Sequence, residues 1–211
     1  MRVLAVAARK GGAGKSTIAA SLAVAAAQAG ERVAVVDLDP QGSVAEWGAR
    51  REAQDLRIIP PKDVEDEKLP GILARIRETA SLAILDTPGT FDPNVTAALA
   101  TADLTVIPVR PSILDLSATR RTVEALGLMG RRYAFILSQV MPASPARAEE
   151  AARVLVQVGA LVPAAIAHRA DYLDAMMTGQ GVTEWAPASK AATEITSLWS
   201  WIKSELESAT A

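Results

Sequence analysis

The sequence predicts an α/β fold: a doubly wound, mostly parallel sheet with helices on both faces. Short and nearly continuous apolar runs alternate along the chain with longer segments of helical spacing. That alternation is expected of a parallel sheet whose strands are buried on both sides. The chain has 211 residues, which suits one domain with a sizeable core. Because we find no repeat, low-complexity block or linker, we expect residues 1–211 to form a single domain.

In the first half of the chain, four apolar runs predict strands, and each is followed by a segment with helical features. We expect these strands at residues 3–8, 32–38, 57–59 and 82–85. We expect helices at residues 17–29, 44–52, 69–79 and 95–101, and Gly30 is a natural end for the first of them. The stretch 60–69 begins with two prolines and is strongly charged, so we expect a surface loop there.

The second half continues the alternation. We expect strands at residues 104–109 and 133–137, and a weaker one at 161–166 that Pro163 interrupts. Helices are expected at residues 117–129, 145–158 and 191–207. The last helix carries apolar side chains at helical spacing, namely Ile195, Leu198, Trp199, Ile202 and Leu206. The strands thus alternate with helices to the end of the chain.

Composition excludes several classes of protein. The chain has no Cys and one His, which rules out a disulfide framework, a zinc–thiolate site and an iron–sulfur cluster bound by its own thiolates. The first apolar run meets Arg9 and Lys10 too soon for a signal peptide. No stretch approaches the ~20 apolar residues that a membrane-spanning helix requires. We therefore expect a cytoplasmic protein.

A glycine-rich stretch between the first strand and the first helix predicts a phosphate-binding loop. Glycines let backbone N–H groups point at phosphate oxygens, and the helix N-terminus adds a partial positive charge. Lys15 would contact the β- and γ-phosphates of a nucleotide, and the Ser16 hydroxyl is placed to bind Mg²⁺. The candidate nucleotide contacts are Lys10, Gly11, Gly12, Ala13, Gly14, Lys15, Ser16 and Thr17.

Acidic residues follow two further strands of the predicted sheet. Asp37 and Asp39 lie two positions apart at the end of the second strand, so they are expected on one side of the chain. Asp86 ends the apolar run at residues 82–85. Ligands of open α/β sheets bind beyond these strand ends, where carboxylates can hold hydrated Mg²⁺ and orient a water molecule. A polar strand end that leads into a turn would have the same local sequence.

The phosphate loop departs from the usual pattern, because Arg9 stands where the first Gly is expected and Lys10 precedes the glycines. This form, followed by D-x-D-P-Q-G after the second strand, resembles the deviant Walker A ATPases of the ParA/MinD superfamily, and most closely the short ParF-like branch. The resemblance implies ATP and Mg²⁺ as cofactors and an ATP-bound homodimer in which Lys10 reaches the partner's nucleotide. It implies catalytic roles for Lys10, Lys15 and Asp39, and in particular that Asp39 positions the hydrolytic water. It also implies that Ser16, Asp37 and Asp86 form the metal site. Gly89 replaces the second Pro of the family's D-T-P-P segment.

The resemblance extends over nearly the whole chain. The segments from Pro108 to Asp115 and from Ile166 to Val182 match the family's middle and C-terminal patterns. In relatives the second segment begins near the adenine, so Ala167 and His168 become candidate base contacts. The N-K-x-D string that specifies guanine is absent, which favours ATP over GTP.

Charge is distributed unevenly along the chain. Residues 110–169 carry 8 basic and 4 acidic residues, a net charge of +4, although the whole chain has −2. Because ParA relatives bind DNA nonspecifically as ATP-bound dimers, the resemblance makes this segment a candidate DNA surface. A solvated helix face would have a similar composition. The candidate contacts are Arg120, Arg121, Arg147, Arg153 and Arg169; such binding should weaken with salt.

The sequence therefore suggests a nucleoid-associated ATPase that drives plasmid or chromosome partition or positions a large cargo. A ParB-like protein or another small adaptor would stimulate hydrolysis. A MinD-like membrane-surface ATPase is the alternative, and it needs a basic amphipathic helix at the end of the chain. The last expected helix carries Glu194, Glu205 and Glu207 against Lys203, and anionic lipid would repel it, so a membrane partner is not expected.

Overall fold

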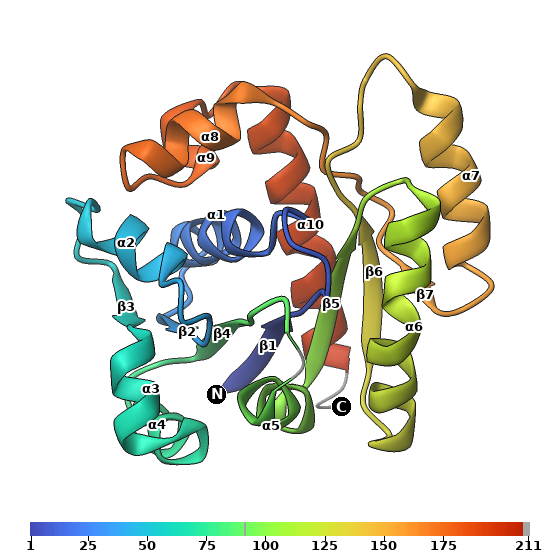
Figure 1. Ribbon diagram of the computed structural model, residues 1–211. Helices are drawn as coiled ribbons and strands as arrows, with labels where there is room; N and C mark the ends of the chain where they lie inside the picture. The colour runs from blue at the N-terminus through green and yellow to red at the C-terminus, as the bar shows by residue number, and fades with distance from the viewer. Residues whose placement is uncertain (91, 209–211) are drawn as a thin grey trace.

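The computed structural model describes residues 1–90 and 92–208, and its centre is one sheet of seven strands (Figure 1). All neighbouring strands in this sheet are parallel, and their order is β3-β2-β4-β1-β5-β6-β7. In chain order the strands are β1 (Arg2–Val6), β2 (Val33–Asp37), β3 (Leu56–Ile59), β4 (Leu82–Asp86), β5 (Leu104–Val109), β6 (Tyr133–Leu137) and β7 (Ala160–Leu161). This arrangement confirms the predicted doubly wound α/β class.

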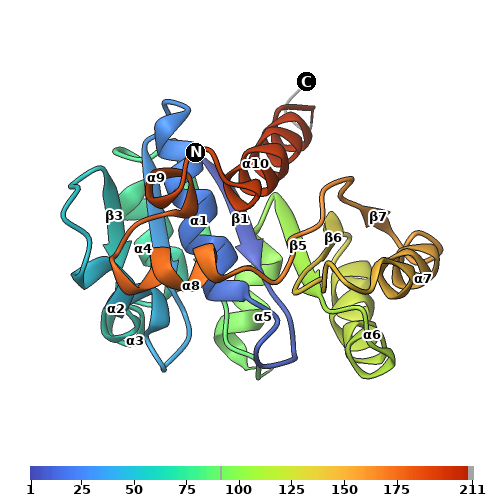
Figure 2. The same ribbon diagram turned by 90° about the horizontal axis from the view of Figure 1, so that it is seen from above.

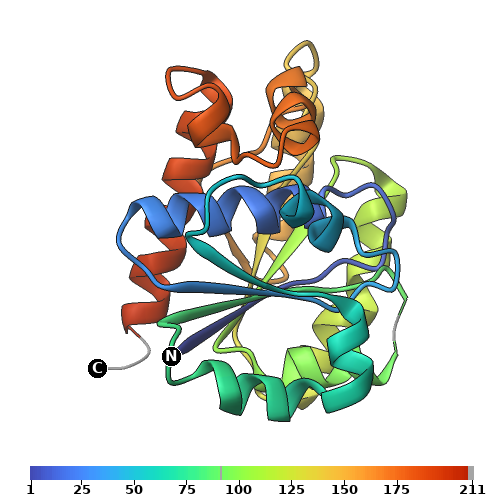
Figure 3. The same cartoon turned by 90° about the vertical axis from the view of Figure 1, so that its left-hand side faces the viewer.

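Helices connect the strands and form the two outer layers. They are α1 (Lys15–Gln28), α2 (Ser43–Ala49), α3 (Pro61–Glu67), α4 (Leu69–Ile76), α5 (Pro93–Thr101), α6 (Ile113–Leu128), α7 (Pro145–Leu155), α8 (Ala170–Met177), α9 (Val182–Trp185) and α10 (Lys190–Ser208). Figure 3 shows the sheet nearly edge-on, with α1 above it and the helices α3 to α5 below it. Described residues contain no helix with the length and apolar character needed to cross a bilayer.

Side-chain alternation along the central strand explains why both faces of the sheet are buried. Leu4 and Val6 of β1 face the core formed with α1, α2 and α8 to α10, whereas Val3 and Ala5 face the core beneath α3, α4 and α5. A third apolar cluster fills the space between the β5–β6 part of the sheet and the helices α5, α6 and α7. A parallel sheet covered in this way requires the nearly continuous apolar strands that the sequence shows.

The register of the sheet brings the chemically important strand ends together. β4 lies between β1 and β2, and Asp86 is paired with both Val6 of β1 and Asp37 of β2. The phosphate loop follows β1 directly, so it lies at the same sheet edge as these two carboxylates. Parallel strands place their carboxyl ends on one side, which is where ligands of such sheets bind.

Two expectations from the sequence are wrong. The charged stretch at residues 60–69 is not a loop but contains α3. Pro61 occupies the first helical turn, where a proline costs nothing, and Val64 is buried against the core. The expected strand at residues 161–166 is reduced to the two-residue β7, because the chain leaves the sheet before Pro163.

Candidate nucleotide-binding site

The loop between β1 and α1 has the backbone geometry of a phosphate-binding loop. Gly12 and Gly14 have φ angles of 75° and 86°, which glycine adopts without the penalty that a Cβ would bring. Gly14 is the N-cap of α1, so the first free N–H groups of that helix point into the loop. Lys15 begins the helix and is almost buried (8% exposed). Its ammonium group lies 3.9 Å from the position of a Cβ on Gly89, so the turn after β4 packs against the loop.

Asp86 is buried beneath this loop. Both of its carboxylate oxygens are inaccessible and lack a hydrogen-bond partner among the described residues. Burial raises the pKa of Asp86 to about 7, and the nearby Ser16 hydroxyl opposes this rise, although the two groups do not form a hydrogen bond of good geometry. A buried carboxylate without a hydrogen-bond partner destabilises the fold unless a cation balances its charge. Asp86 and Ser16 therefore fit Mg²⁺, which usually takes one or two protein ligands and completes its shell with phosphate and water.

Asp37 is fully buried, and both of its oxygens are used within the protein. One oxygen accepts the backbone N–H of Asp39 at 3.1 Å, and the other accepts those of Val44 and Ala45 at 3.0 and 2.9 Å. The last two donors belong to the first turn of α2, so Asp37 satisfies amides at that helix N-terminus. Burial raises its pKa, and the three hydrogen bonds oppose the rise. These contacts fix the loop that carries Asp39.

Asp39 itself is half-buried and lines an open cleft. Its side chain accepts the N–H of Gln41 at 3.0 Å. The same cleft is lined by much of the predicted phosphate site and by the turn after β4, namely Gly11, Gly12, Gly14, Lys15, Ser16, Thr17 and Gly89. Lys10 lies on the other side of the loop, where it lines a small cavity toward α6. No three Asp, Glu or His side chains gather into a metal cluster within the described residues, so a cation here would depend on phosphate ligands as well.

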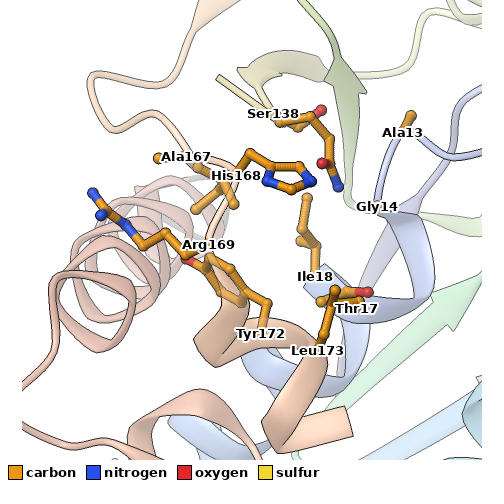
Figure 4. Close-up of a pocket in the computed structure, with 12 residues that line it drawn as sticks. Ala13, Gly14, Thr17, Ile18, Ser138, Ala167, His168, Arg169, Tyr172 and Leu173 are labelled. Carbon is orange, nitrogen blue, oxygen red and sulfur yellow. The ribbon is translucent and has the colours of Figure 1, made fainter. Parts of the chain in front are cut away.

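A second pocket adjoins the loop and suits the base of a nucleotide (Figure 4). Ala13, Gly14 and Thr17 form one wall, and the predicted Ala167 and His168 form the opposite wall. The backbone N–H groups of Ala167 and His168 already donate to Glu194 and to the carbonyl of Val140. Their carbonyls and the exposed imidazole are therefore the groups left to recognise a base.

Two residues that shape this pocket were not among the site residues predicted from the sequence. Glu194 of α10 accepts hydrogen bonds from the Ala167 N–H at 3.1 Å, the Tyr172 hydroxyl at 3.0 Å, and Nε and Nη2 of Arg169 at 2.9 and 2.7 Å. Gln139 follows β6 with a φ of 54° and lines the pocket. No local motif marks either residue; the position of Gln139 just beyond a strand end was the available signal.

The candidate DNA-contacting arginines lie mainly on two neighbouring helices. Arg120 and Arg121 project from α6, and Arg147 and Arg153 from α7, and Figures 1 and 2 place these helices side by side. All four are exposed. Arg169 differs, because it forms an ion pair with Glu194 at 2.7 Å and is only 23% exposed. Glu194 therefore holds Arg169 at the wall of the pocket beside Ala167 and His168.

A glycine-rich loop between a parallel strand and a helix, an adjacent lysine and a buried carboxylate on the neighbouring strand define a P-loop nucleotide-binding protein. Comparison with known proteins identifies the family of this P-loop protein. A model of the CobQ/CobB/MinD/ParA nucleotide binding domain matches residues 4–182, so the chain belongs to this family. It is an ATPase of the ParA/MinD type.

Individual relatives fit this assignment. The chain is similar to Maintenance of carboxysome distribution protein A of Gloeobacter kilaueensis, with 38% identity over 193 residues, 87% of this chain and 85% of that protein. Its identity to the chromosome-partitioning ATPase Soj of Thermus thermophilus is 29% over 153 residues, 60% of this chain and 61% of that protein. The septum site-determining protein MinD of Pyrococcus horikoshii, complexed with Mg-ADP, shares the fold, with a TM-score of 0.81 and 19% identity over 95% of each chain.

Proposed function

We propose that this protein is a Mg²⁺-dependent ATPase that works as an ATP-bound dimer on nonspecific DNA and positions a large cargo. The observation that carries the proposal is the meeting of the phosphate loop, Asp39 and the unpartnered Asp86 at one edge of the sheet. A partner protein would stimulate hydrolysis, and the subunits would then separate and leave DNA.

Each residue at the cleft has a distinct proposed task. The loop amides and Lys15 bind the β- and γ-phosphates and stabilise the charge that develops during transfer. Mg²⁺, held by Ser16 and Asp86, would neutralise phosphate charge when bound. Asp39 orients the attacking water molecule from its half-exposed position on the cleft wall. Asp37 supports the metal site indirectly, because it anchors the Asp39 loop through backbone hydrogen bonds.

Dimerisation would use the face that carries the phosphate loop. Lys10 is half-buried beside the loop, and Gly11 and Gly12 are exposed, so another subunit can approach this face. In the proposed dimer, Lys10 crosses to the nucleotide of the partner. A single-subunit cycle would leave Lys10 without a function in the chemistry.

The basic surface of α6 and α7 would bind DNA phosphates. It carries four exposed arginines, and Arg120 already forms a surface ion pair with Glu124 at 2.9 Å. Exposed pairs of this kind are weak, so DNA can replace the glutamate. Doubling the surface in a dimer would bring the number of phosphate contacts into the range where binding depends steeply on salt.

Cargo positioning is favoured over DNA partition by the pattern of relatives. The similarity to the carboxysome distribution protein spans 87% of this chain, whereas that to the partition protein Soj spans 60%. We therefore propose that the protein positions a large protein-based cargo, to which a small adaptor protein links it. A ParB-like partner would instead indicate DNA partition.

The membrane-surface alternative has less support. The apolar residues of α10, including Leu198, Trp199 and Ile202, are buried in the core formed with α1. That face is therefore not available to lie on a bilayer.

The proposal is tested with the Asp39→Ala variant, which should bind ATP without hydrolysing it. With Mg²⁺ and ATP, we expect a dimer by light scattering and retention of unrelated duplex DNA that falls steeply as salt rises. ADP should give a monomer that releases DNA. A variant that stays monomeric with ATP, or that binds DNA equally well with either nucleotide, contradicts the proposed cycle. Co-sedimentation with anionic vesicles in place of DNA would instead support the membrane alternative.

A further inference from the structure

Arg110 follows β5 directly, and its side chain reaches the phosphate loop. β5 pairs with β1, so the loops after these two strands lie next to each other at the sheet edge. The Nη1 atom of Arg110 lies 3.7 Å from the position that a Cβ on Gly12 would occupy. The side chain is 33% exposed and lies beside Gly12, which lines the cleft, although Arg110 itself is not part of the cleft wall.

The orientation of this guanidinium is fixed from behind. Its Nε donates to Oδ1 of Asp115 at 2.9 Å, and the side chain of Asp115 is only 6% exposed. The other oxygen of Asp115 accepts a short hydrogen bond from the hydroxyl of Ser112, the N-cap of α6. Asp115 is thus held at the first turn of α6 and in turn holds one edge of Arg110.

The other edge of the guanidinium has no assigned role in the folded chain. Within the described residues, neither Nη1 nor Nη2 of Arg110 has a hydrogen-bond partner. A guanidinium keeps its charge at physiological pH and has donors left after one carboxylate contact. The ion pair with Asp115 offsets the positive charge of Arg110, but it leaves the N–H groups of Arg110 beside Gly12 free to bind an anion.

The position of Gly12 identifies which part of a nucleotide these donors would meet. Gly12 lines the cleft that also holds Lys15 and Asp39 but not the base pocket, whereas Ala13 lines only the base pocket and Gly14 lines both. The cleft end of the loop is therefore the end of the terminal phosphates. Phosphate oxygens are the acceptors that suit a preoriented guanidinium.

We propose that Arg110 is a third phosphate-binding cation beside Lys10 and Lys15, oriented by Asp115 and Ser112, and that it contacts the terminal phosphate oxygens of the nucleotide bound to its own subunit. This rests on the proposed use of the cleft for ATP. Because ADP lacks the last phosphoryl group, Arg110 sets the preference for ATP over ADP.

The test compares the affinity of the full-length protein for ATPγS and ADP, each with Mg²⁺, by calorimetry. Arg110→Gln should weaken ATPγS binding about tenfold, as expected for a lost charge-assisted hydrogen bond, and ADP binding less than about threefold. Arg110→Lys keeps the positive charge but loses the planar, forked arrangement of N–H donors, so its affinity for ATPγS should lie between those of wild type and Arg110→Gln. The matched control is Arg77→Gln, an exposed arginine after α4 at the opposite sheet edge, which should leave both affinities unchanged.

Asp115→Asn tests the positioning role, and it should shift the ATPγS-to-ADP preference in the same direction by a smaller factor. Equal weakening of both ligands by Arg110→Gln, or no change in either, overturns the proposal. If Arg110→Gln does not fold, Arg110→Lys must still change the preference. A wild-type protein that prefers ATPγS yet never dimerises contradicts the proposed cycle and leaves the role of Arg110 intact.

Discussion

The anchoring of the Asp39 loop by Asp37 leads to a measurable difference between two neighbouring carboxylates. Asp37→Ala would leave three backbone N–H groups without an acceptor: that of Val44, which is buried, and those of Asp39 and Ala45, which are partly buried. Each unsatisfied buried donor costs about 1–3 kcal/mol. We take the lower end for each donor, because two of the three hydrogen bonds are only partly buried. The expected loss is about 3 kcal/mol, or a melting temperature lower by roughly 6–12 °C for a chain of this size.

Asp39→Ala is the matched control, because it removes the same group two residues away. Asp39 is half-buried, and its side chain accepts one hydrogen bond, from the N–H of Gln41. We expect it to change stability by less than about 1 kcal/mol. Urea unfolding followed by tryptophan fluorescence is a suitable assay, since Trp47 is fully buried on α2. Equal unfolding midpoints for Asp37→Ala and wild type would refute the anchoring role.

Three other changes test the account. Burial raises the pKa of Asp86 to about 7, so deprotonation of Asp86 should destabilise the nucleotide-free protein as pH rises from 5 to 7. Measured by urea unfolding, the free energy of unfolding of wild type should fall relative to that of Asp86→Asn by at most ~1.4 kcal/mol per pH unit. A difference between the two proteins that does not change with pH would show that Asp86 titrates normally. Arg51→Met should destabilise the fold by about 3 kcal/mol, because the substitution removes a guanidinium that is only 4% exposed and deprives Glu184 of its ion pair; an unchanged melting temperature would contradict this. Gly179→Ala should destabilise the fold more than Gly30→Ala. Both glycines have a positive φ, but only at Gly179 would the new methyl group lie 2.5 Å from backbone atoms at the end of α2. Equal melting temperatures of the two variants would mean that this contact relaxes freely.

The parts of the site that local sequence determines could be predicted. The phosphate loop, α1 and the end of β4 follow from neighbouring residues, and the structure places Lys15, Ser16 and Asp86 together as expected. The alternation around Asp37 placed both aspartates at the strand end, but it could not show that Asp37 accepts amides seven and eight residues further along.

Features that depend on distant segments could not be predicted. The support that Glu194 gives to the base pocket joins residues 22 to 27 positions apart, and no spacing rule relates them. The helix α3 was missed because its prolines and charges are typical of loops, whereas burial of Val64 against the sheet stabilises a helix. Tertiary packing decides both cases.

ATP turnover by wild type and by Asp39→Ala tests the central claim most directly. Both proteins would be incubated with Mg²⁺ and ATP, separated from free nucleotide, and assayed for released phosphate and for bound ATP. We predict slow phosphate release by wild type, and no release with about one retained ATP per subunit for Asp39→Ala. Phosphate release by Asp39→Ala at the wild-type rate would contradict the assignment of this cleft as the site of hydrolysis.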